Sequence, residues 1–77
     1  MSAVADTYTL ALITDQGAMS APLSEITVHG VRDAAAALGV PIPDPVGLAY
    51  DLAAAYLNGR VEGTVTTDSG TWVVRRG

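Results

Sequence analysis

The chain contains no cysteine, no phenylalanine and only one histidine. The lack of cysteine excludes disulfides and thiolate metal sites, and one histidine cannot build a structural zinc site, so we expect no metal and no cofactor. A core formed by 77 residues rarely contributes more than roughly 3–5 kcal/mol to stability. Because alanine, valine and leucine dominate the apolar residues, the composition leaves a plain monomer, a homo-oligomer and an obligate partner open.

Lysine is also absent, and the net charge is −4. An acidic chain repels nucleic acid and anionic membranes at long range. The lack of lysine, together with many Ala, Gly, Val, Arg and Asp residues, is typical of a GC-rich coding sequence, so we expect a bacterial or phage origin. The cations are all arginines: Arg32, Arg60, Arg75 and Arg76.

Long hydrophobic runs are missing too. No apolar run approaches the roughly 18 residues that a membrane span needs, and "MSAVADTYTL" has no basic region before its apolar residues. We therefore predict a cytoplasmic protein that does not enter a membrane. Its expected organisation is a flexible N-terminus over residues 1–6, followed by a single α+β domain over residues 7–77.

The N-terminal part of the chain predicts strand structure. Residues 7–14, "TYTLALIT", alternate with a period of two, which is typical of a β-strand, and "DQG" is a turn signal. The next segment, residues 22–30, is ambiguous. It is either a strand with Ile26 and Val28 on one face, or the start of a helix capped by Ser24. The β-branched residues favour the strand, with the helix then beginning near residue 31.

The middle of the chain predicts two helices. The alanine run in residues 31–38 is a strong helix former, and Gly39 fits a C-terminal cap. A proline-rich turn follows, and Asp44 before Pro45 is a typical helix start. This second helix should reach about residue 58. Its apolar residues cover well over half of its circumference, so it needs neighbours on more than one side.

The C-terminal residues predict a β-hairpin turning at "DSG". A three-residue loop that ends in a left-handed Gly70 pairs Val65 with Val73. A two-residue Ser-Gly turn pairs Val65 with Val74 instead. The residues alone leave both registers open, and Trp72 faces the core in only one of them.

This order of elements resembles the winged-helix family over residues 31–76. Ala35, Leu38, Gly39 and Val40 match the small, apolar, glycine and apolar positions of a helix-turn-helix. The resemblance implies DNA binding through the start of the second helix, with a two-stranded wing behind it.

The residues that would read DNA bases depart from the winged-helix pattern. Positions 41–47 contain no side chain that donates a hydrogen bond to a base edge, and Asp44 is anionic. DNA binding is therefore the alternative function, and its phosphate contacts are expected to come from the arginines near the C-terminus: Arg60, Arg75 and Arg76.

No enzyme signature is present. His29 is the only imidazole and belongs to no recognisable triad. Asp44 and Asp51 share a helix face, which an ordinary solvated strip also produces. The segment "DQGAMS" lacks the lysine and second glycine of a phosphate loop. We therefore predict a protein that is not an enzyme.

The remaining positive signal is the excess of apolar and aromatic residues. Tyrosine and tryptophan are favoured at protein interfaces because they combine large area with a polar group. The predicted interaction residues are Tyr50, Tyr56, Leu57 and Trp72. The sequence thus predicts a small protein–protein interaction module, such as an accessory or inhibitor protein that occupies a partner surface, with a homodimer as the expected assembly.

Overall fold

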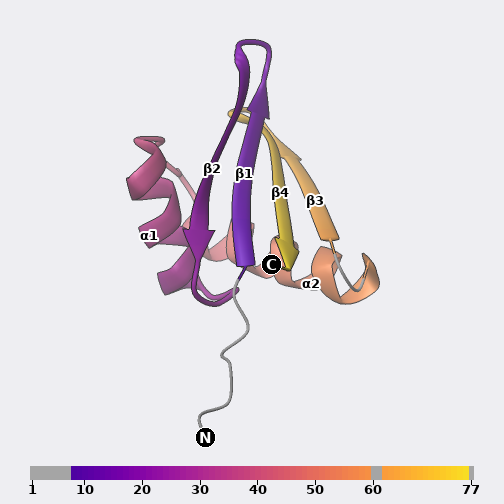
Figure 1. Cartoon of the computed structure of the whole chain (residues 1–77). Helices are drawn as coiled ribbons and strands as arrows, with labels where there is room; N and C mark the ends of the chain where they lie inside the picture. The colour runs from indigo at the N-terminus through magenta and orange to yellow at the C-terminus, as the bar shows by residue number, and fades with distance from the viewer. Residues whose placement is uncertain (1–7, 60–61, 77) are drawn as a thin grey trace, which may run out of the picture.

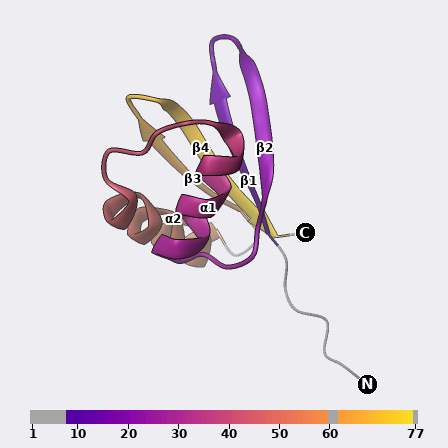
Figure 2. The same cartoon turned by 90° about the vertical axis from the view of Figure 1, so that its left-hand side faces the viewer.

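Two β-hairpins build one antiparallel sheet, and the two helices between them in the chain cover one face of it (Figures 1 and 2). The computed structural model describes residues 8–59 and 62–76, so the predicted flexible segment 1–6 lies outside the described residues. The predicted α+β class is confirmed. The elements are β1 (Tyr8–Thr14), β2 (Gly17–Leu23), α1 (Val28–Leu38), α2 (Pro45–Gly59), β3 (Glu62–Thr67) and β4 (Gly70–Arg76).

The sheet is joined at its centre by β1 and β4, in the strand order β2-β1-β4-β3. Leu10 pairs with Val74 and Leu12 pairs with Trp72, and all four side chains are buried beneath the helices. The period-two alternation that predicts β1 therefore marks the face that forms the core. Since this pairing connects the two ends of the chain, the core forms only when both hairpins are in place.

The structure corrects the interpretation of residues 22–30. A strand through Ile26 and Val28 is wrong: the strand β2 lies earlier and α1 already begins at Val28. The helix cap is Thr27, not Ser24, and its Oγ1 accepts a hydrogen bond from the Gly30 amide at 3.1 Å. A satisfied N-cap stabilises a helix by about 1 kcal/mol, which outweighs the weak strand preference of β-branched residues.

The predicted boundaries between the helices are confirmed. Gly39 ends α1 in the left-handed conformation, with φ of 73°. Asp44 caps α2, because its Oδ1 accepts the Gly47 amide at 3.0 Å, and Pro45 is the first helical residue. The proline-rich connector therefore separates two helices whose ends are each fixed by local chemistry.

Both predicted registers of the C-terminal hairpin are wrong. The turn contains Asp68 and Ser69, so Thr67 pairs with Gly70 and Val65 lies opposite Trp72. The N-terminal hairpin uses the same four-residue pattern, Thr-Asp-X-Gly, over residues 14–17. In each turn the threonine hydroxyl donates to the glycine carbonyl and accepts the amide of the X residue, which fixes the two-residue loop.

The hydroxyl of Thr67 has one further contact that Thr14 does not share. It accepts a hydrogen bond from the indole Nε1 of Trp72 at 3.1 Å. Trp72 is 1% exposed and is the largest buried side chain. The turn is therefore tied to the centre of the core, and the polar atom of the buried indole is satisfied.

We expect Thr67→Val to destabilise the fold more than Thr14→Val. Both substitutions remove turn hydrogen bonds, but only the first leaves a buried indole N–H without an acceptor, at a cost of about 1–3 kcal/mol. Urea unfolding followed by tryptophan fluorescence measures the difference. Equal losses for the two variants would contradict the role of this bond.

Close packing of β3 against α2 requires Gly63. A Cβ at this position would lie 2.5 Å from the Tyr56 nitrogen and 2.8 Å from the Ala55 carbonyl carbon. We expect Gly63→Ala to cost about 1–3 kcal/mol, because the backbone of α2 has to move. Gly59→Ala is the control, since its Cβ meets nothing within 4 Å. Thermal unfolding of both variants tests this, and an unchanged midpoint for Gly63→Ala would overturn it.

Candidate functional site

The helix α2 is apolar on two sides, and only one of them rests on the sheet. Leu48, Ala49 and Leu52 are buried in the core. The opposite side carries Val46, Tyr50 and Leu57, which are 60%, 77% and 76% exposed. We define the outer face of α2 as these three residues together with Ala53 and Ala54, so that it comprises Val46, Tyr50, Ala53, Ala54 and Leu57.

The structure separates the four predicted interaction residues. Tyr50 and Leu57 lie on the outer face of α2. Tyr56 is partly buried and packs edge-on against Tyr8, with 5.5 Å between ring centroids. Trp72 is 1% exposed, so its assignment to a contact surface is corrected to the core.

Val46 is a surface residue that the predicted interaction set omits. It precedes Tyr50 by one helical turn and lies 60% exposed beside it on the same face. The spacing of residues 46, 50 and 57 places them along one side of the helix. From the sequence alone, however, nothing distinguishes this apolar stripe from the one that enters the core.

The outer face of α2 carries no charged side chain. Asp51 is the only charged side chain of the helix, and it belongs to a neighbouring pocket. An apolar face of this kind binds by removing hydrocarbon surface from water rather than by charge attraction. Its chemistry therefore suits another uncharged surface.

A pocket of about 210 Å³ lies between the start of α2 and the β3–β4 turn. Its apolar wall includes Leu48 and Trp72, and three carboxylates line it, from Asp44, Asp51 and Asp68. The pocket thus brings together the two helix aspartates that the sequence places on one face, and adds a third. No cation lines it among the described residues, so its electrostatics disfavour an anion such as phosphate.

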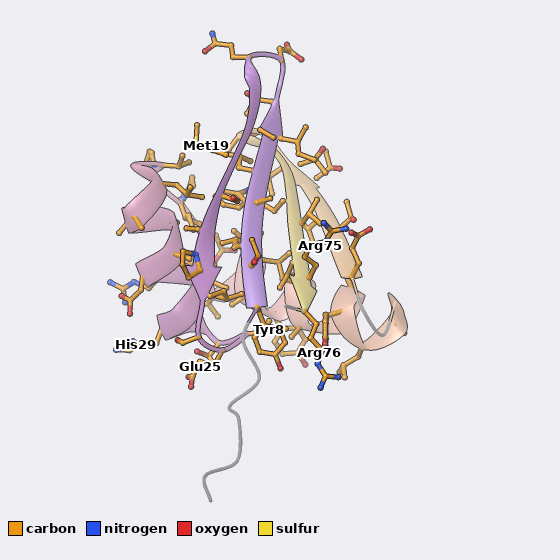
Figure 3. The ribbon with its side chains drawn as sticks, in the orientation of Figure 1. Tyr8, Met19, Glu25, His29, Arg75 and Arg76 are labelled. Atoms are coloured by element: carbon orange, nitrogen blue, oxygen red, sulfur yellow. The ribbon has the colours of Figure 1, made fainter. Side chains whose placement is uncertain are left out.

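The structure describes two of the three arginines assigned to phosphate contacts, and neither of these two lies at the start of α2. Arg75 and Arg76 lie on β4 at the end of the sheet opposite the hairpin turns (Figure 3). Arg75 is paired with Glu62 through a 3.1 Å contact, which neutralises part of its charge. Arg76 is exposed, and Arg60 lies outside the described residues.

His29, the residue considered for catalysis, does not line the α2 pocket with Asp44 and Asp51. His29 is an exposed residue of the first turn of α1, far from the α2 pocket in sequence and on another element (Figure 3). Within residues 8–59 and 62–76, no three His, Cys, Asp or Glu side chains are grouped as metal ligands. Neither described helix has the length and hydropathy that crossing a membrane requires.

The uncovered face of the sheet is a second, more polar surface. Its central residues Thr9, Ala11, Thr71 and Val73 have short side chains and are partly buried. Ile13 is the large apolar residue there, with 47% of its surface exposed. The outer face of α2 therefore offers more exposed hydrocarbon than the sheet does.

No protein-family model, no curated protein and no solved structure matches the chain.

We expect no salt-dependent binding to duplex DNA. The net charge is −4, Arg75 is paired, and the start of α2 presents Asp44. Fluorescence anisotropy of labelled DNA at about 50 and 200 mM salt should give a flat baseline. Micromolar binding that weakens steeply with salt would contradict this expectation and favour the winged-helix alternative.

Proposed function

We propose that this chain is a non-enzymatic protein–protein interaction module and that the outer face of α2 is its contact surface. One observation carries the proposal: Val46, Tyr50 and Leu57 are large apolar residues, each more than half exposed, aligned on an uncharged face. The opposite side of the helix already packs on the sheet. A partner is therefore the means of removing this face from water.

The size of the face is adequate for a modest interaction. Complete burial of one large aliphatic or aromatic side chain contributes about 1.5–3 kcal/mol. Three such residues offset much of the loss of translational and rotational freedom, for which estimates begin at about 4 kcal/mol. Tyr50 provides the aromatic anchor that energetically dominant contact residues often have.

The biological role proposed for the module is that of a bacterial or phage accessory or inhibitor protein. Such a protein acts by covering a surface of its partner rather than by chemistry of its own. Support comes from the composition typical of GC-rich coding sequences and from the extended apolar outer face of α2.

Retention of proteins from an extract of the source cells tests the proposal. Immobilised wild-type chain should retain at least one protein, another copy of the chain included, that Tyr50→Glu loses. Ala37→Glu is the matched control, because it adds the same charge at an exposed position of α1. Circular dichroism verifies that both variants fold. Identical retention by wild type, variant and control would overturn the proposal.

A further inference from the structure

We propose that the occupant of the outer face of α2 is a second copy of this chain, packed α2 against α2 in antiparallel orientation. The two-fold axis crosses the helix pair between residues 51 and 52. This inference rests on the proposed function and specifies its partner.

The outer face is complementary to itself when the helix is reversed. Reversal about the midpoint between residues 51 and 52 exchanges position 46 with 57 and position 50 with 53. Val46 then packs against Leu57 of the second copy, and the Tyr50 ring packs over Ala53 of the second copy. At the centre each Tyr50 ring meets a small alanine, and at the ends the aliphatic Val46 and Leu57 meet each other. The same patch is therefore complementary to itself, which an isologous interface requires.

The spacing of these residues is that of a helix-pairing seam. Positions 46, 50, 53 and 57 are separated by four, three and four residues, the pattern that keeps side chains along one helix–helix contact. Gly47 and Ala54 flank the seam on one side and are small. They permit the axes to approach to about 8–10 Å. A parallel pair of helices would instead place Tyr50 against Tyr50 and bring the two N-terminal ends of α2 side by side, and likewise the two C-terminal ends.

Electrostatics also favours the antiparallel arrangement. The positive end of each helix dipole lies beside the negative end of the other. Asp51 is exposed and lines the pocket beside the β3–β4 turn, and it is not one of the seam residues, so the seam buries no like charges. Two chains of charge −4 repel at long range, and salt screens this repulsion over about 8 Å at physiological ionic strength. The dimer should therefore become tighter as salt increases.

The length of α2 limits the area that the dimer interface can bury, and therefore the affinity of the dimer. A 15-residue helix is about 22 Å long. One helix pair of this length belongs to the smaller class of interfaces, below about 1,200 Å². We therefore expect dissociation constants in the micromolar range, which sedimentation at several concentrations measures.

Disulfide trapping tests the orientation, because the chain has no cysteine of its own. Val46→Cys and Leu57→Cys are prepared separately, one of them carrying a tag that changes its size. Mixed under mild oxidation, they should form the mixed dimer. Each variant alone should cross-link poorly, because equal positions lie about 16 Å apart along the antiparallel pair, beyond the reach of a disulfide.

Ala37→Cys measures random collision, because it places an exposed thiol on α1, away from the seam. Mixed-dimer yield well above this control supports the proposal. Efficient cross-linking of Val46→Cys with itself overturns the antiparallel orientation. If no combination of variants cross-links more than the Ala37→Cys control, a second copy of the chain is not the occupant of the outer face.

Sedimentation distinguishes failure of this inference from failure of the proposed function. The wild type should dimerise more tightly at higher salt, and Tyr50→Glu should weaken dimerisation by roughly tenfold or more, since it buries an unpaired charge. A wild-type chain that stays monomeric at all concentrations overturns the dimer. The proposed function then still stands if Tyr50→Glu, unlike Ala37→Glu, loses a different protein in the retention experiment.

Discussion

The arrangement of this molecule depends on one constraint: α2 is apolar around most of its circumference, but a single sheet supports only one side of it. Leu48 and Leu52 fill the space above β4 and β3. Gly63 permits the backbones to approach closely there, which fixes the rotation of the helix about its axis. Once that rotation is fixed, Tyr50 and Leu57 must point away from the sheet. The exposed face is therefore a consequence of how the core is packed.

The core itself is centred on Trp72, in a chain without phenylalanine. Its indole N–H is bound by the hydroxyl of Thr67, so the tip of one hairpin and the middle of the sheet are coupled. Pairing of β1 with β4 then joins this hairpin to the N-terminal one. Since the core is small and formed by contacts distant in sequence, burial of a second apolar face against a partner would stabilise the fold as well.

Local signals in the sequence predicted most of the elements. Asp44 with Pro45, and the alanine run before Gly39, defined the helices because capping and propensity act over a few residues. The strand β2 was misplaced, because its residues have little β preference and are held by the neighbouring strand. The register of the C-terminal hairpin depends on the turn hydrogen bonds of the Thr67 hydroxyl. The sequence signal for this turn is that Thr-Asp-X-Gly occurs in both hairpins. Tyr50 and Leu57, which the sequence places among the interaction residues, are exposed in the structure. Trp72 can be assigned to the core only when the register of its strand is known.

The most direct test of the antiparallel α2–α2 dimer is a series of amide ¹H–¹⁵N NMR spectra recorded from micromolar to millimolar concentration. The dimer should give concentration-dependent shifts confined to α2, largest around the outer face from Val46 to Leu57, with the amides of β1 and β4 unchanged. Spectra that do not change with concentration, or shifts centred on the uncovered sheet face around Ala11 and Val73, would contradict it.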